Sequence, residues 1–216
     1  MIDQAGGCIF DLDGTLYDSS GFALHLIAEQ PFEAFLLLAE RKTRKSLAGS
    51  DYGQAESYYR EFFSRLSQAA GKPEQLLRKW YFESYMPRMC RVLNKYYRPR
   101  SHLNELFGHL LKNDFKFSVY SDYPFVMQRL HALGLPVEGY RFYSPEDFGA
   151  QKPALRPFLS IADAMHVVPG ETLVVGDRDD TDGAGAAAAG MGFFRIKTDG
   201  DWGSFCSYIH SKLEKL

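Results

Sequence analysis

The sequence of 216 residues has few cysteines and no long apolar segment. Its three cysteines, Cys8, Cys90 and Cys206, are odd in number, far apart and without CxxC spacing, which predicts reduced thiols and a cytoplasmic location. No run of eighteen or more apolar residues occurs, so we expect no membrane-spanning helix. The first ten residues, MIDQAGGCIF, have neither a basic start nor a long apolar stretch, and we expect no secretory signal.

A large charge surplus is also missing. The formal net charge is −2, so we expect neither nucleic acid nor a membrane surface as a partner, and the oligomeric state stays open. The charge is unevenly distributed, because residues 17–100 carry 14 Lys/Arg and 9 Asp/Glu, a local charge of +5. Such a basic segment is either a solvated surface, an aid to closure onto the acidic remainder, or a site for a second anionic group of a substrate.

Several common functional motifs do not occur. There is no GxxxxGK[ST] or GxSxG sequence, and the six histidines have no ligand spacing. A calcium loop aligned on Asp182-Gly183 would begin at Arg178 and end at Ala189, neither of which is a ligand. The GxGxxA match at residues 183–188 follows four acidic residues that would repel a pyrophosphate, so close helix packing explains its small residues better.

The periodicity of the remaining sequence divides the chain in two. From about Phe22 to Tyr97 apolar residues recur every three or four positions, which predicts about four helices and no strand. Helical and strand-like segments then alternate. The expected helices are Leu103–Leu111, Phe125–Leu133, Phe158–Met165 and Ala184–Ala189, and the expected strands are Ile9–Phe10, Phe115–Ser121, Tyr140–Tyr143, Thr172–Val175 and Phe193–Ile196. This alternation is typical of an α/β fold with a parallel sheet.

Carboxylates follow several of these strands. Asp11 and Asp13 follow the first strand, Ser121 and Asp122 follow a second, and Asp177 follows a third. Because the carboxyl ends of parallel strands form the ligand-binding edge, these side chains are expected to converge there. Clustered carboxylates repel one another unless a hard cation lies between them, which predicts Mg²⁺ as the cofactor.

Neighbouring residues suit phosphate chemistry. Asp11 and Asp13 face the same side of an extended strand, so one can attack while the other moves a proton. Gly14 permits a tight turn whose backbone N–H groups can hold an anion. Lys152, followed by a proline, would supply a fixed positive charge, and Ser121 a hydroxyl donor.

Together these motifs resemble those of the haloacid dehalogenase superfamily. The hydrophobic-DxDGT motif stands here as IFDLDGT (9–15), the strand ending in Ser or Thr as SVYSD (118–122), the motif lysine as Lys152 in GAQKP, and the acidic motif as GDRDDTD (176–182). All four occur in family order. The resemblance implies a Rossmann-like parallel sheet core, formed by residues 1–16 and 98–216, with an inserted all-helical cap domain at residues 17–97.

The resemblance also implies roles for individual residues. Asp11 is the expected nucleophile, Asp13 the general acid and base, and Lys152 the third catalytic residue. The expected metal ligands are Asp11, Asp177 and the backbone carbonyl of Asp13, with Asp182 supporting the metal or Lys152, although Asp179 and Asp180 compete for that role. The expected phosphate-binding residues are Leu12, Asp13, Thr15, Ser121, Asp122 and Lys152. Asp122 departs from the asparagine often found there.

The function predicted on this basis is a Mg²⁺-dependent phosphatase that hydrolyses a small phosphorylated metabolite through an aspartyl-phosphate. Asp13 favours this over dehalogenation, because the dehalogenating branch lacks an acid at that position. The alternatives are a sugar phosphomutase that uses the same intermediate, and a catalytically silent phosphate-binding or regulatory protein.

Overall fold

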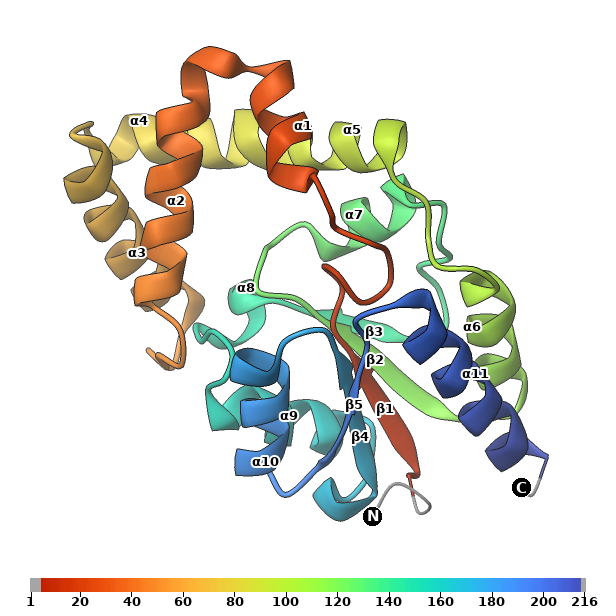
Figure 1. The fold of residues 1–216 in the computed structure, drawn as a ribbon. Helices are drawn as coiled ribbons and strands as arrows, with labels where there is room; N and C mark the ends of the chain where they lie inside the picture. Colours follow the sequence, from red (N-terminus) through yellow and green to blue (C-terminus); the bar gives the residue numbers. More distant parts are fainter. Residues whose placement is uncertain (1–4, 215–216) are drawn as a thin grey trace.

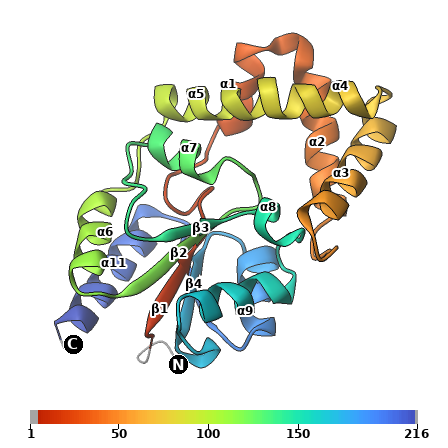
Figure 2. The same cartoon turned by 180° about the vertical axis from the view of Figure 1, so that it is seen from behind.

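A computed structural model describes residues 5–214 of the chain. Its centre is a five-stranded sheet in the order β3-β2-β1-β4-β5, in which every neighbouring pair is parallel. Helices cover both faces of the sheet, and a helical segment stands above its carboxyl edge (Figures 1 and 2). The predicted α/β fold with a parallel sheet is therefore confirmed. The strands are β1 (Gly7–Phe10), β2 (Lys116–Tyr120), β3 (Arg141–Tyr143), β4 (Thr172–Gly176) and β5 (Gly192–Arg195).

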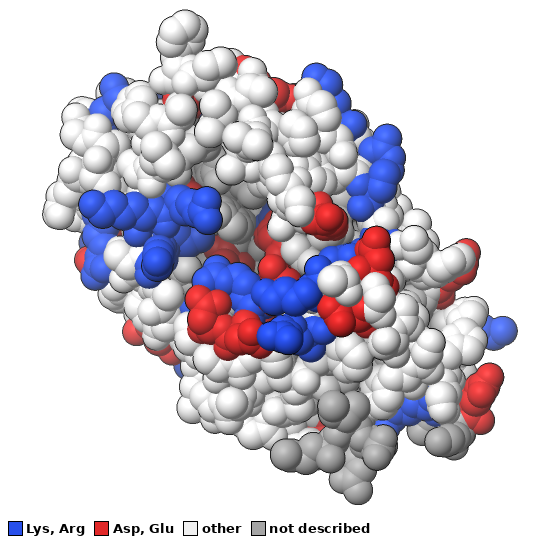
Figure 3. Space-filling view, viewed as in Figure 1, with Lys and Arg blue, Asp and Glu red and all other residues white. Residues whose placement is uncertain are grey.

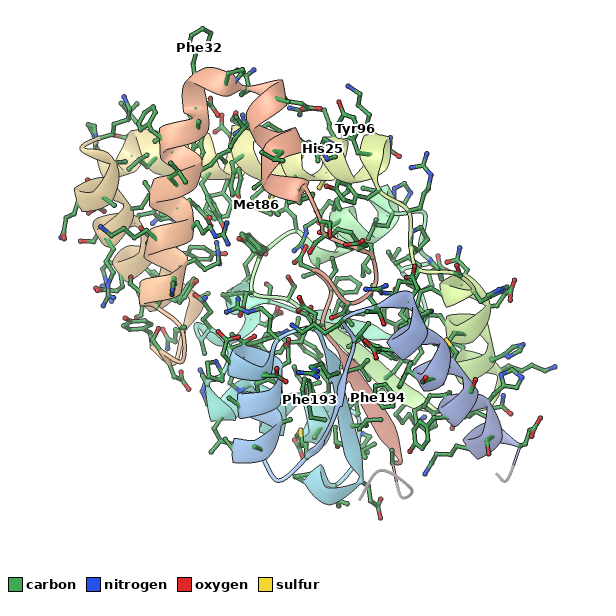
Figure 4. All side chains as sticks on the ribbon, viewed as in Figure 1. His25, Phe32, Met86, Tyr96, Phe193 and Phe194 are labelled. Carbon is green, nitrogen blue, oxygen red and sulfur yellow. The ribbon has the colours of Figure 1, made fainter. Side chains whose placement is uncertain are left out.

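Alternate residues of the central strands bury opposite faces of the sheet. Cys8 and Phe10 join the larger core under α6 (Leu103–Lys112) and α11 (Asp199–Leu213), whereas Ile9 joins a second core under α9 (Leu155–Ala164) and α10 (Ala184–Ala188). Figure 4 shows the same alternation on β5, where Phe193 and Phe194 point to opposite sides. A strand buried on both faces is what a doubly covered parallel sheet requires.

The helical segment between β1 and α6, residues 22–96, is called the cap below. It consists of α1 (Phe22–Glu29), α2 (Ala34–Ser46), α3 (Ala55–Ala70), α4 (Glu74–Lys79) and α5 (Met86–Tyr96). A π-helical turn, η3 (Trp80–Tyr85), joins α4 to α5, so the two run on as one long rod in Figure 1. The four helical rods agree with the sequence prediction, and α3 is followed by Gly71, whose positive φ of 64° ends the helix.

Aromatic side chains form much of the interior of the cap. Tyr58, Tyr59, Phe62, Phe63 and Tyr81 are buried there in mutual edge and stacked contacts. No single helix in residues 5–214 has the length and apolarity to cross a membrane. The segment Phe22–Glu29 with Pro31–Ser46 meets those criteria only as a pair bent by 114°.

Helix packing and hydrogen bonds join the cap to the core. Helix α5 packs on α7 (Val126–Ala132), and α3 packs on the short helix α8 (Pro145–Phe148). Next to α8, backbone hydrogen bonds run from Gly49 N to Lys152 O (3.0 Å), from Tyr52 N to Gly149 O (2.9 Å) and from Gln151 N to Ser50 O (3.0 Å). The loop that carries Lys152 is thus bonded directly to the cap.

Candidate active site

The register of the sheet brings the predicted motifs to one edge. Phe10 of β1 is paired with Val119 of β2 on one side and with Val175 of β4 on the other. The residues that follow these three positions are therefore neighbours in space. This alignment places Asp11 between Ser121 and Asp177, as the strand pattern predicts.

Asp11 and Asp182 share Lys152. The Lys152 ammonium lies 2.7 Å from Asp11 Oδ1 and 2.8 Å from Asp182 Oδ1, and all three residues are buried. The other oxygen of Asp11 accepts a hydrogen bond from the Thr15 hydroxyl at 3.0 Å. A buried charge needs such partners, because an unpaired one is costly. Lys152 is thus fixed beside the predicted nucleophile.

A third carboxylate completes this group. Asp11, Asp177 and Asp182 each offer an oxygen, and these atoms lie within 4.8 Å of one another. Within residues 5–214, Asp177 forms no hydrogen bond or ion pair of its own. The backbone lies close to it at Gly14, which has φ +90°, and a Cβ built at Gly14 would lie 2.4 Å from Asp177 Oδ2. A carboxylate with no hydrogen-bond or ion-pair partner among the described residues, next to two other carboxylates, fits a Mg²⁺ ion.

The pKa shifts of Asp11, Asp177 and Lys152 also favour a bound cation. Burial raises the pKa of Asp11 well above its usual range, Lys152 opposes the rise, and Asp182 and Asp177 add to it. Burial and the charge of Asp182 raise the pKa of Asp177 to about 6. Burial disfavours the Lys152 charge, but Asp11 and Asp182 outweigh it and raise the pKa of the ammonium. Without a cation, this group holds more negative charge than Lys152 offsets.

Asp13 lies outside this carboxylate group, in a separate network. Its Oδ1 accepts a hydrogen bond from the Tyr17 hydroxyl at 2.7 Å, and its Oδ2 accepts one from the Ser121 hydroxyl at 3.2 Å. The fully buried guanidinium of Arg129 also binds Oδ2 in an ion pair. Burial would raise the pKa of Asp13, but the charge and hydrogen bond of Arg129 outweigh it and hold that pKa below its usual value.

The side chain of Asp122 is bonded to the Lys152 loop. Its Oδ1 accepts the Lys152 backbone N–H at 3.0 Å, and its carbonyl accepts Arg44 Nη1 at 2.5 Å. A carboxylate repels a phosphate, so only the main chain of Asp122 remains to meet one. Leu12 likewise offers only its main chain, because its side chain is fully buried in the core.

The structure distinguishes between the acids of the fourth motif. Asp182 is buried against Lys152, whereas Asp179 and Asp180 are exposed and pair with Arg195 and Arg178. Asp182 alone of the three therefore lies in the site.

Three site residues were not predicted from the sequence. Tyr17 and Arg129 hold Asp13, and Arg44 of α2 reaches from the cap to the backbone of Asp122. One signal was present for Arg129, because Val126, Leu130 and Leu133 place it on the apolar face of its helix. A charged residue on a buried face is expected to have a buried partner.

The site opens between cap and core. Figure 3 shows a hollow there with acidic side chains at its floor, and Lys and Arg side chains gather over the lower part of α2 beside it. The exposed basic residues of this part of α2 are Arg41, Lys42 and Lys45. The positive charge of the cap thus borders the hollow.

Comparison with known proteins gives the family. The model of the haloacid dehalogenase-like hydrolases matches residues 6–190, and no curated protein matches the chain. Solved structures share the fold. A 2-haloacid dehalogenase from Pseudomonas syringae pv. Tomato DC3000 is 23% identical at a TM-score of 0.58, with 88% of this chain and 85% of that chain covered.

Two further structures show the same fold. An L-2-haloacid dehalogenase from Xanthobacter autotrophicus is 18% identical at a TM-score of 0.59 and covers 89% of this chain and 77% of its own. A haloacid dehalogenase family hydrolase from Deinococcus radiodurans R1 with bound phosphate and sodium is 19% identical at 0.53, with coverages of 88% and 80%. On the family match over most of its length, the chain belongs to the haloacid dehalogenase-like hydrolases.

Proposed function

We propose that this hydrolase is a Mg²⁺-dependent phosphatase that acts on a small phosphomonoester through an aspartyl-phosphate. The observation that carries the proposal is the separation of two carboxylates on one strand end. Asp11 lies in the group with Asp177 and Asp182, whereas Asp13 lies in the network of Tyr17 and Ser121. Two carboxylates in different environments suit a nucleophile and a proton-transfer group.

In the first step, an oxygen of Asp11 attacks phosphorus and the bond from phosphorus to the leaving oxygen breaks. Asp13, whose lowered pKa leaves it ionised, takes the proton of the bound phosphate monoanion and passes it to that oxygen as the alcohol departs. Lys152 and the turn amides offset the charge on the equatorial oxygens, and Ser121 donates a hydrogen bond to one of them. In the second step, water attacks the phosphorus of the aspartyl-phosphate, Asp13 takes the water's proton, and Asp11 is released with inorganic phosphate.

Asp11, Asp177 and the backbone carbonyl of Asp13 would hold Mg²⁺, with Asp182 supporting them. When bound, the ion supplies charge neutralisation at the phosphoryl oxygens. The other interactions with the phosphoryl group come from residues of the protein itself. Backbone hydrogen bonds join the loop that carries Lys152 to Gly49 and Ser50 of the cap. A movement of the cap would therefore also move the Lys152 ammonium.

A dehalogenase is the competing hydrolase, since two of the structural neighbours carry that name. A departing halide takes no proton, so the first step of such a reaction leaves Asp13 without a task. One experiment separates the possibilities. Metal-loaded protein is screened against phosphorylated metabolites for released phosphate and against 2-haloacids for released halide. We expect phosphate alone. Halide release without phosphate release would overturn the proposal, and transfer to a sugar without free phosphate would identify a mutase.

A further inference from the structure

Arg129 connects Asp13, a predicted catalytic residue, with Ser121, a predicted phosphate-binding residue, although it belongs to none of the four family motifs. Its guanidinium, on α7, is fully buried. One terminal nitrogen donates to Ser121 Oγ at 3.0 Å and the other binds Asp13 Oδ2. Among residues 5–214, Asp13 is its only ion-pair partner. Its Nε has no hydrogen-bond partner among the described residues.

The hydrogen bonds at Ser121 show what this contact does. A hydroxyl has one hydrogen to donate and two lone pairs. Ser121 Oγ accepts the Tyr123 backbone N–H at 3.1 Å and Arg129 Nη1 at 3.0 Å, so both lone pairs are occupied. The single hydrogen is therefore directed to Asp13 Oδ2, which lies 3.2 Å away. Arg129 thus helps to set the direction of this hydroxyl.

Asp13 is held on both of its oxygens. Tyr17 binds Oδ1 at 2.7 Å, and Ser121 and Arg129 share Oδ2. The Asp13 side chain is still 24% exposed, in contrast to Arg129, which is fully covered. In the structure the Ser121 hydrogen points to Asp13; when a bound phosphoryl oxygen takes that hydrogen bond, Tyr17 and Arg129 still hold Asp13 in place. An arginine fork reaches two acceptors in fixed geometry, which a lysine ammonium does not.

We propose that Arg129 is a positioning residue of the phosphoryl-transfer site, which fixes the Asp13 carboxylate for proton transfer and directs the Ser121 hydroxyl. This inference rests on the proposed function, since it assigns Asp13 the proton and Ser121 the phosphoryl group. It predicts that loss of Arg129 harms most those substrates whose leaving oxygen needs a proton.

The kinetic test compares p-nitrophenyl phosphate, whose leaving group needs no proton, with ethyl phosphate, whose leaving group does. For Arg129→Met we expect kcat/KM to fall on the order of 100-fold for ethyl phosphate and no more than about 10-fold for p-nitrophenyl phosphate. Arg129→Lys should recover part of the loss on ethyl phosphate. Equal losses on both esters, or no loss on either, would overturn the inference.

Arg88→Met is the matched control. Arg88 is equally buried and pairs with Glu33 in the cap, 2.8 Å from Nη2 to Oε2, without contact to Asp13 or Ser121. Arg88→Met should lower the urea midpoint of unfolding, because a buried ion pair is lost. The ratio of the kcat/KM values for the two esters should stay that of the wild type. A changed ratio in this control would show that loss of stability alone explains the effect of Arg129→Met.

A second measurement does not depend on turnover. Arg129→Met should lower the urea midpoint, and adding Asp13→Asn to the same chain should lower it little further, because the partner of the removed charge goes with it. Additive losses would show that the pair does not act as a unit, and would overturn the inference. If the pair is coupled but the wild type hydrolyses neither ester, the proposed function fails while the Arg129–Asp13 pairing stands.

Discussion

Asp11 and Asp13 lie two residues apart, yet their surroundings assign them different tasks. Asp11 contacts Lys152 and Thr15, and Asp13 contacts Arg129 and Tyr17. We expect Asp11→Asn to lower kcat by a factor on the order of 10³ or more, because the attacking carboxylate oxygen is lost. Asp13→Asn should still be phosphorylated on Asp11 by an activated ester, but should lose the phosphate slowly.

Mass spectrometry of protein quenched after mixing with p-nitrophenyl phosphate checks both variants. The Asp13→Asn protein should carry one phosphate on the peptide that contains Asp11, and the Asp11→Asn protein should carry none. Phosphate trapped on Asp11→Asn would show that another residue is the nucleophile.

Asp177 should make the metal-free protein pH-sensitive. Its pKa of about 6 lies above the value of 3.8 for a free carboxyl, so the folded state binds its proton more tightly than the unfolded state does. Stability therefore falls as pH rises from about 4 to about 6, and the penalty persists above that range. We expect Asp177→Asn to raise the free energy of unfolding of metal-free protein at pH 7.5 by roughly 1–3 kcal/mol.

Thermal unfolding with a chelator present tests this. The Tm of Asp177→Asn should exceed that of the wild type by several degrees at pH 7.5, and the two should coincide near pH 4. Added Mg²⁺ should then stabilise the wild type more than the variant. A Tm below the wild type at pH 7.5 in chelator would contradict the raised pKa.

The strand ends and the family motifs were enough to predict that Asp11, Lys152 and Asp177 lie close together, but they left Asp182 in competition with Asp179 and Asp180, which only the structure separates. They did not reveal Tyr17, Arg129 or Arg44. Their partners lie on other elements or in the local turn. The sequence alone does not show which side chains of α2, α7 and the sheet edge contact one another.

At the scale of elements, the Ala-rich helix α10 tests the interpretation of its small residues as packing contacts. A Cβ built at Gly185 would lie 2.1 Å from the ring of Phe158 on α9. Gly185→Ala should therefore force the two helices apart and cost about 1–3 kcal/mol of stability. Urea unfolding measures this loss.

Gly108 on α6 provides the matched control. It is exposed in its helix, and a Cβ built there meets no atom within 4 Å. Gly108→Ala should stabilise the protein by up to about 1 kcal/mol, because alanine favours a helix over glycine. If Gly185→Ala also stabilises, close packing is not the reason for the small residues of α10.

The elements that the sequence predicted are those with a clear period. The helices of the cap and the strands of the core belong to this class, whereas α11 and α8 were not anticipated. Helix α11, Asp199–Leu213, carries two glycines and alternates polar and apolar residues, which weakens the helical pattern. Its Thr198–Asp201 capping box was nevertheless a readable start signal. Helix α8 is only four residues long, too short to show a period.

At the scale of the whole molecule, the site is assembled from both parts of the chain. Arg44 of the cap binds the backbone of Asp122, and the Tyr58 hydroxyl donates to Gln151 Oε1 at 3.0 Å, next to Lys152. A cap that opens would have to break these contacts or carry the Lys152 loop with it. The insertion of the cap after the first motif was evident from the change in sequence period, but these contacts depend on the folded arrangement.

The central claim is that clustered carboxylates need a hard cation for phosphoryl transfer to Asp11. The most direct measurement is phosphate release from p-nitrophenyl phosphate by protein stripped of metal with a chelator, before and after addition of Mg²⁺. We predict no release from the stripped protein, restoration by Mg²⁺, and no restoration in Asp11→Asn. Full phosphate release by the metal-stripped wild type, or undiminished release by Asp11→Asn, would contradict it.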